Sequence, residues 1–364
     1  MSNNNLWVDF NSSSAEEWIA KIEKDLKGRS YSELYHKITE EISLAPAIFD
    51  HEGKPALMAD RLMNDWQIGA YFRVSSSQEV KTINQQLITA LEEGCDSPRI
   101  IVDSSLSGDD WDILLRDVNL SYISLYIEIN NLQFPINDML SYFKGRKDLD
   151  YKKLFILTNN ATYDRMCNNA QFQCTSLKIA FDADPTKMLS FFVNAADNAF
   201  RKIANSNDID TALNQQFVTT ILITKDYFGS ISLIRAMRLL WENLKSAWDI
   251  KDNQAELFIN VEFEASSYAQ DPYNNLIRAA TMASSAIIGG CDRLEILVAN
   301  TGDSPEEKKF ASRIARNVQH ILKLESYLDK VVDPSAGSYY IETYTDSLVE
   351  NVWHKFLSSL HLNN

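Results

Sequence analysis

Three glutamates, Glu262, Glu264 and Glu295, lie at or just beyond the ends of predicted strands in the second half of the chain. The carboxyl ends of parallel strands meet at one edge of a sheet. Paired carboxylates there could do acid–base chemistry or hold a divalent cation. Strand alternation would turn some of these side chains outward, between helices. Because no histidine, lysine or second aspartate motif stands beside them, the pattern favours a structural interpretation over catalysis.

Other reactive patterns are not found in the sequence. The Gly-rich pieces IIGG and SAGS lack the spacing of a Walker or dinucleotide-binding loop and fit helix ends and turns. The four cysteines show neither C-x-x-C nor metal-ligand spacing: Cys95, Cys167, Cys174 and Cys291. The net charge of −15 disfavours nucleic acid or an anionic membrane as a partner, whereas a CoA ester would need only a local basic cluster. With neither a signal-peptide pattern nor an apolar run of ~18 residues, we expect a cytoplasmic protein.

The elements that must position these residues alternate regularly from residue 66 onward. Apolar runs predict strands near 66–73, 98–103, 121–128, 153–158, 175–182, 216–223, 256–263 and 293–298. Helical patterns cover 76–93, 108–116, 136–144, 186–205, 226–248, 271–288, 304–324 and 345–360. The connection after the fourth run, 153–158, shows a weaker helical pattern than the others. Eight strands joined by helical crossovers predict an α/β protein with the (β/α)8 TIM-barrel fold. In such a barrel any active site lies at the carboxyl ends of the strands.

A helical arm precedes the barrel. Ser14 begins a capping-box pattern, and Gly28 follows the helix as a stop. A second short helix is predicted over 31–36. The chain therefore divides into an N-terminal helical arm, 1–40, and a barrel, 41–364.

The most informative stretch runs from Asp271 to Glu342. Asp271-Pro272 begins a helix, Gly289-Gly290 ends it, and a buried strand and another helix follow. Four blocks stand out in this order: DPYNN-x-IR, the Gly-Gly break, A-x-RIARN-x-Q and DP-x-x-GSYY-x-E. Together they resemble the barrel domain of the methylmalonyl-CoA mutase family, and the resemblance extends weakly over almost the whole chain.

The resemblance implies a particular chemistry. In that family adenosylcobalamin starts a radical rearrangement of an acyl-CoA held in the barrel, and a second, C-terminal domain holds the cobalamin through a D-x-H-x-x-G motif. None of the five histidines of this sequence lies in such a motif. We therefore expect no cobalamin domain here, no cofactor bound by this chain, and adenosylcobalamin on a partner chain.

The resemblance also points to positions near the substrate. The family's W-T-I-R-Q-Y segment supplies a tyrosine close to the reacting carbons. Here the segment is WQIGAY, which keeps Tyr71 but has Gln67 and Gly69 in place of the threonine and the arginine. The arginine that binds the substrate carboxylate at the start of the sixth strand corresponds to Gln216, which carries no charge.

The last two strands depart from the family as well. The family's seventh strand ends with a histidine that hydrogen-bonds the thioester carbonyl, and here Val261, Glu262 or Phe263 stands in its place. A carboxylate could donate that bond only if burial raised its pKa strongly. The eighth strand has LEIL instead of L-H-T-N. The residues expected to face a substrate are Tyr71, Gln67, Gln216, Glu262 and Glu295, and we predict no catalytic, cofactor-binding or metal-binding residue.

Replacement of polar residues at three strand ends predicts a non-catalytic small subunit, which stabilises a catalytic large subunit in a heterodimer. One alternative is the acyl-CoA-binding barrel of an active mutase, interconverting methylmalonyl-CoA and succinyl-CoA, whose cobalamin domain is on another chain. Another is a free-standing barrel that binds CoA esters. A hollow bore would favour an active barrel, whereas strands rich in Ile, Leu and Phe predict a filled one.

Two structural expectations accompany this hypothesis. The segments EEW and KDLKG resemble the N-terminal arm that packs on the partner subunit in the family; a helix covering the bottom of its own barrel is the open alternative. Arg235 and Arg238 match helix arginines of the family, not its substrate arginine, and are expected in a surface or interdomain ion pair.

Overall fold

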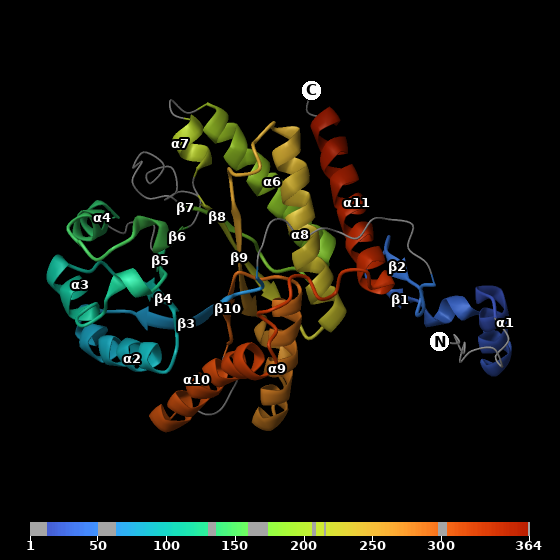
Figure 1. The fold of residues 1–364 in the computed structure, drawn as a ribbon, viewed down its shortest axis with the longest axis horizontal. Helices are drawn as coiled ribbons and strands as arrows, with labels where there is room; N and C mark the ends of the chain where they lie inside the picture. The colour runs from blue at the N-terminus through green and yellow to red at the C-terminus, as the bar shows by residue number, and fades with distance from the viewer. Residues whose placement is uncertain are drawn as a thin grey trace, which may run out of the picture.

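The computed structural model describes residues 13–49, 63–129, 136–158, 174–205, 209–214, 216–297 and 304–362. An 8-stranded parallel sheet curls into a nearly closed barrel, with hydrogen-bonded neighbours in the order β6-β5-β4-β3-β10-β9-β8-β7 (Figure 1). Its strands are β3 (Gln67–Val74), β4 (Ser97–Val102), β5 (Leu125–Ile129), β6 (Leu154–Thr158), β7 (Cys174–Lys178), β8 (Gln216–Ile223), β9 (Leu257–Phe263) and β10 (Arg293–Glu295). The (β/α)8 barrel predicted from the sequence is confirmed.

Helices surround the barrel, and several of them start at well-formed caps. Asp271 accepts a hydrogen bond from the Tyr273 N–H, and Ser304 forms a capping box with Glu307. In Figure 1, α2, α3 and α4 cover one side of the sheet and α6, α8 and α11 the other. Their bounds are α2 (Val80–Glu92), α3 (Gly108–Leu114), α4 (Ile136–Lys144), α6 (Pro185–Ala204), α7 (Ile209–Leu213), α8 (Tyr227–Ala247), α9 (Pro272–Ile288), α10 (Pro305–His320) and α11 (Tyr339–Leu362).

Strand alternation divides the side chains between two environments. Outward residues, such as Ile100 on β4 and Ile259 on β9, are fully buried against the helices. Inward residues fill the bore. This division matters for the site, because it decides which polar side chains of each strand face the barrel axis.

An ion cluster fixes α11 against α8. Arg235 on α8 is fully buried and donates hydrogen bonds to Asp333 and, at 2.7 Å, to Glu342. Arg238 donates to Asp292 at 2.7 Å. The expectation of a surface or interdomain ion pair was wrong, because both arginines bind acids of their own barrel, Arg235 from a buried position and Arg238 from a half-buried one.

The N-terminal arm lies apart from the barrel strands. It comprises α1 (Ala15–Asp25), a 3-10 turn (Tyr31–Leu34) and a two-stranded hairpin, β1 (His36–Lys37) with β2 (Ser43–Leu44). α1 has no buried residue and lies beyond α11, on the far right in Figure 1. The alternative in which the arm covers the bottom of its own barrel was therefore wrong.

Several element boundaries differ from the prediction. Residues 121–124 do not belong to β5, because the Asn119 side chain caps a 3-10 turn (Leu120–Tyr122) instead. α11 begins at Tyr339, earlier than expected, and α10 continues into a π-helical turn (Ile321–Glu325). The connection between β6 and β7, residues 159–173, lies outside the described residues. Over the described ranges, every helix is too short or too polar to span a bilayer.

Candidate functional site

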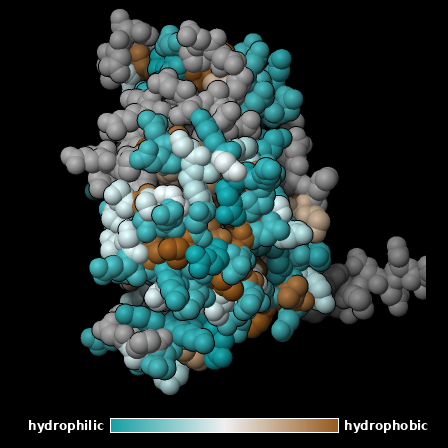
Figure 2. All heavy atoms as spheres, turned by 90° about the vertical axis from the view of Figure 1, so that its left-hand side faces the viewer, coloured by the Kyte–Doolittle hydropathy of each residue, from teal (hydrophilic) through white to brown (hydrophobic). Residues whose placement is uncertain are grey.

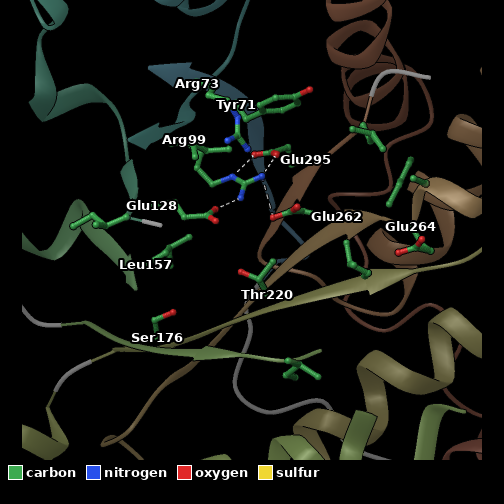
Figure 3. A pocket seen from close by; sticks show the side chains of 17 residues that line it. Tyr71, Arg73, Arg99, Glu128, Leu157, Ser176, Thr220, Glu262, Glu264 and Glu295 are labelled. Carbon is green, nitrogen blue, oxygen red and sulfur yellow. Dashed lines mark hydrogen bonds and ion pairs between the residues drawn. The ribbon is translucent and has the colours of Figure 1, made fainter. Parts of the chain in front are cut away.

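A cavity of about 470 Å³ opens at the carboxyl ends of the strands, where (β/α)8 barrels place their chemistry (Figure 3). Its polar lining comprises Tyr71, Arg73, Arg99, Glu128, Ser176, Thr220, Glu262, Glu264 and Glu295, and apolar side chains such as Leu157 complete the wall. We call this the mouth cavity. It contains four glutamates and two arginines, so its charge is predominantly negative.

One guanidinium holds the glutamates of three strands together (Figure 3). Arg99 on β4 donates from Nε to Glu295 on β10 at 3.1 Å, and from Nη2 to the other oxygen of that carboxylate. Its Nη1 donates to Glu128 on β5, and its Nη2 lies 3.1 Å from Glu262 on β9. Arg293, below Glu295 on β10, donates to the same carboxylate at 2.8 Å. Three carboxylates thus surround one buried arginine; we call this group the Arg99 cluster.

Alternation and register bring two of the three predicted strand-end glutamates, Glu262 and Glu295, together. On β9, Glu262 points into the barrel, whereas Val261 and Phe263 are buried in the outer core. Glu295 is the register partner of Glu262 on the neighbouring strand β10. Of the three residues considered for the place of the family's histidine, Glu262 and Phe263 border the cavity and Val261 does not, so Glu262 is the polar one among them.

Burial and the neighbouring charges shift the pKa values of Glu262 and Glu295 in opposite directions. Burial raises the pKa of Glu262 to about 7, with a further contribution from the Glu295 carboxylate. Burial also acts to raise the pKa of Glu295, but Arg99 and Arg293 outweigh it and the net shift is downward. Desolvation opposes the charge of Arg99, yet its carboxylate partners raise its pKa overall. Arg99 and Glu295 are thus a charged pair, while Glu262 exchanges a proton near neutral pH.

The chemistry open to this arrangement is limited. Among the described residues, no group of three or more His, Cys, Asp or Glu side chains is placed to hold a metal ion. The space between the carboxylates is taken by the Arg99 guanidinium, which lies within hydrogen-bonding reach of each. Glu264 lies at the cavity wall and caps a short turn by accepting from the Ser266 N–H at 3.3 Å. Glu262 is well placed to accept or donate a proton toward the cavity.

Below the Arg99 cluster the bore is filled with aromatic rings. Tyr126 stacks on Phe155 with centroids 4.4 Å apart and an interplanar angle of 7°, and Phe258 lies 5.4 Å from Phe155. The Arg293 guanidinium lies 4.6 Å from the centroid of the Tyr126 ring. The Tyr126 hydroxyl donates to the Gln67 amide oxygen at 2.9 Å. This layer closes the barrel beneath the cavity and gives the filled bore that the apolar strands predicted.

The residues expected from the sequence to face a substrate fall at two levels of the barrel. Tyr71, Glu262 and Glu295 line the mouth cavity. Gln67 lies in the layer below, where its amide also donates to Ser124 at 2.9 Å. Gln216 is the first residue of β8, half-buried at the end of that strand away from the cavity. The structure therefore brings three of these residues together and separates Gln67 and Gln216 from them.

The sequence reasoning missed the arginines that organise the site and one of its glutamates. Arg99 and Glu128 each interrupt an apolar strand run, in PRIIV and LYIEI. A charged residue within such a run was the available signal, because it must find a buried partner. Arg293, at the first position of β10, gave no comparable signal.

Comparisons with known proteins agree with the motifs. Residues 203–358 match the family model described as methylmalonyl-CoA mutase. The methylmalonyl-CoA mutase small subunit of Porphyromonas gingivalis is 26% identical, over 97% of this chain and 64% of that protein. The large subunit of the same organism is 24% identical, over 80% of this chain and 48% of that protein. The methylmalonyl-CoA mutase of Rhizobium meliloti is 38% identical over 36% of this chain and 18% of its own length.

Solved structures give a more distant likeness. Dihydropteroate synthase from Xanthomonas albilineans aligns with a TM-score of 0.42 at 12% identity, over 74% of this chain and 95% of that one.

The fold and the site define a (β/α)8 barrel with a buried Arg–Glu cluster at its mouth. More specifically, the chain is related to the methylmalonyl-CoA mutase family, and the resemblance seen in its motifs is confirmed. It spans less than two thirds of the length of the relatives named above, 64% of the small subunit and 48% of the large subunit.

Proposed function

We propose that this chain acts as the non-catalytic small subunit of a methylmalonyl-CoA mutase-type heterodimer and stabilises a catalytic large subunit. The Arg99 cluster is the observation that carries the proposal. A methylmalonyl- or succinyl-CoA brings a carboxylate and phosphates to the strand ends, and these anions need unpaired positive charge. Here the Arg99 guanidinium is already bound to carboxylates on three strands, and glutamates predominate around it.

The layer beneath the cavity supports the same proposal. An acyl-CoA entering along the barrel axis would have to displace the stacked Tyr126 and Phe155 rings, which are 0% and 3% exposed. Aromatic side chains of this size make large contributions to core stability, so their packing favours a barrel kept for its fold. The match to a protein named as a small subunit, over 97% of this chain, points the same way.

The cofactor belongs to the proposed partner. Adenosylcobalamin would supply the radical chemistry when bound, and we assign it to the large subunit. The mouth cavity offers a poor fit for it, because none of the described residues lining that cavity is a histidine and its apolar wall is interrupted by carboxylates. This chain's own contribution is then a rigid barrel whose charged groups are neutralised internally.

One observation favours the active-barrel alternative. The pKa of Glu262 is raised to about 7, so a substantial fraction of this carboxyl group is protonated at neutral pH. A protonated Glu262 could donate a hydrogen bond to a thioester carbonyl, the role of the family's histidine. The alternative is therefore an acyl-CoA-binding barrel that interconverts methylmalonyl-CoA and succinyl-CoA with a cobalamin domain on another chain.

Calorimetry with succinyl-CoA or methylmalonyl-CoA separates the two proposals. We expect no binding or millimolar binding by the purified chain, together with co-elution with a mutase large subunit from the same organism. Micromolar binding, worth about 8 kcal/mol, would overturn the small-subunit proposal. If that affinity fell in a Glu262→Ala variant but not in a Glu264→Ala control, the active-barrel alternative would replace it.

A further inference from the structure

A second cavity, of about 120 Å³, lies beyond the carboxyl end of β8, where the hairpin β1–β2 meets α11 and the starts of α6 and α8. In Figure 1 the hairpin lies beside α11, on the side of the molecule away from the mostly hydrophilic face that Figure 2 shows. Apolar side chains such as Phe181, Met188 and Leu233 form part of its wall. Its polar lining comprises His36, Lys37, Asp182, Thr224, Asp226, Ser230 and Tyr344. We call this the hairpin pocket.

Tyr344 on α11 brings a buried hydroxyl to this pocket. The residue is only 2% exposed, and its hydroxyl makes no hydrogen bond with any residue that the structure describes. Burial and the Asp226 carboxylate raise the pKa of Tyr344, so the hydroxyl is neutral. A buried hydroxyl without a partner costs free energy. Its position at a cavity therefore indicates that a polar group binds there.

Asp226 places a carboxylate oxygen beside this hydroxyl. It caps α8, and its Oδ1 accepts from the Gly229 N–H at 3.0 Å. Its Oδ2 has no donor within the described ranges. A Cβ added at Gly229 would collide with that Oδ2 and lie 3.1 Å from the Tyr344 Oη. Both oxygens therefore border the same small space, and one polar group can contact both.

The charges around the pocket favour a cation over an anion. Asp184 and Asp226 cap the starts of α6 and α8, so the positive ends of both helices already face carboxylates. Asp182 adds a third carboxylate, which lies 3.7 Å from the Lys187 ammonium. Lys37 is exposed on β1 and pairs with none of the described acids. Three carboxylates thus stand against two ammonium groups.

We propose that the hairpin pocket binds a primary ammonium group on a short apolar stem. The ammonium donates to the Asp226 Oδ2 and the Tyr344 Oη, and the stem packs against Phe181, Met188 and Leu233. The cavity has room for roughly four water-sized groups, which suits a stem of about three carbons. The proposal does not depend on the proposed function, because it uses neither the Arg99 cluster nor the aromatic layer below it. The ammonium belongs either to a free amine or to a lysine side chain of another protein.

Thermal unfolding of the full chain in propylammonium chloride tests the proposal, because a ligand that binds the folded state raises Tm with its concentration. We expect Tm to rise with a dissociation constant in the millimolar range, as suits so small a ligand. Propan-1-ol and sodium propionate have the same stem without the positive charge. Neither should raise Tm beyond the effect of sodium chloride at equal ionic strength.

Two conservative variants test the contacts. Tyr344→Phe and Asp226→Asn should each weaken propylammonium binding at least about tenfold, and asparagine keeps the cap of α8. Asp184→Asn is the matched control, because Asp184 caps α6 but does not line the pocket. Glu264→Gln is the control for binding in the mouth cavity and should leave the affinity unchanged. Lys37→Gln should tighten binding, since it removes a like charge.

A Tm that rises no more than in sodium chloride, full affinity in both Tyr344→Phe and Asp226→Asn, or a stronger response to propionate would each overturn the proposal. Loss of binding in Glu264→Gln would do so as well, by placing the amine in the mouth cavity. A blocked lysine, N-acetyl-lysine N-methylamide, distinguishes the two sources of the ammonium. If it binds more tightly than propylammonium, while the norleucine analogue does not bind, the pocket takes a lysine side chain. Tighter binding of propylammonium supports a free amine.

Discussion

Replacing Glu262 by glutamine should stabilise the fold in neutral and alkaline solution and have little effect near pH 4.5. Burial and the Glu295 carboxylate raise the pKa of Glu262 from 4.5 to about 7. The folded chain therefore keeps a proton that the unfolded chain releases as the pH rises between these values, and stability falls across that range. At about 1.4 kcal/mol per pKa unit, the full difference amounts to ~3 kcal/mol above pH 7. Glutamine keeps the shape of the side chain without the buried charge.

Urea unfolding followed by tryptophan fluorescence at pH 5, 6, 7 and 8.5 measures this effect, since the midpoint reports stability when the slope is unchanged. The gain from Glu262→Gln should grow steadily with pH. Glu264→Gln is the matched control, because Glu264 follows the same strand and is only half-buried outside the Arg99 cluster. We expect the control to change stability by less than ~1 kcal/mol at each pH. A gain that is the same at pH 5 and 8.5, or a loss at every pH, would refute the assignment of a destabilising buried charge to Glu262.

Three further predictions concern the same region. Arg99→Met should lower the free energy of unfolding by ~3–5 kcal/mol in urea titrations. The loss should be larger at pH 8 than at pH 5, because the carboxylates left without Arg99 take up protons in acid. Equal losses at the two pH values would contradict this. Gly69→Ala should cost ~1–3 kcal/mol, since its Cβ would lie 2.7 Å from the Arg293 guanidinium, whereas Gly108→Ala meets nothing within 4 Å and serves as the control. Burial raises the pKa of Cys95 to about 12, so iodoacetamide at pH 8 should leave it unmodified in the native chain and alkylate it in urea, as peptide mass spectrometry would show.

The fold could be predicted largely because its local signals agree with one another. Helix caps such as Asp271 and Ser304 stand where the sequence placed helix starts. The errors arose where short-range hydrogen bonds competed with strand formation: the Asn119 side chain accepts from the Ser121 N–H at 3.0 Å and turns the chain before β5 begins. The buried position of Arg235 was missed because its acid partners, Asp333 and Glu342, lie about a hundred residues away in the sequence.

The candidate site shows which part of a barrel alternation can predict. Alternation gives the face of each residue, and it places Gln216 and Glu262 alike toward the axis. The height of a residue along the barrel axis depends on the register between neighbouring strands. The sequence of one strand does not contain that information. Register sets Glu295 beside Glu262 and leaves Gln216 at the opposite end of its strand.

Arg99 reaches three carboxylates because the register brings β4, β5, β9 and β10 to one level at the mouth. Glu262 stands near the position where the family resemblance places a histidine. In the structure its carboxylate belongs to the Arg99 cluster, 3.1 Å from the guanidinium. Because removing one partner of a buried ion pair leaves an uncompensated charge, a change at Arg99 alone would leave Glu128, Glu262 and Glu295 without their common cation.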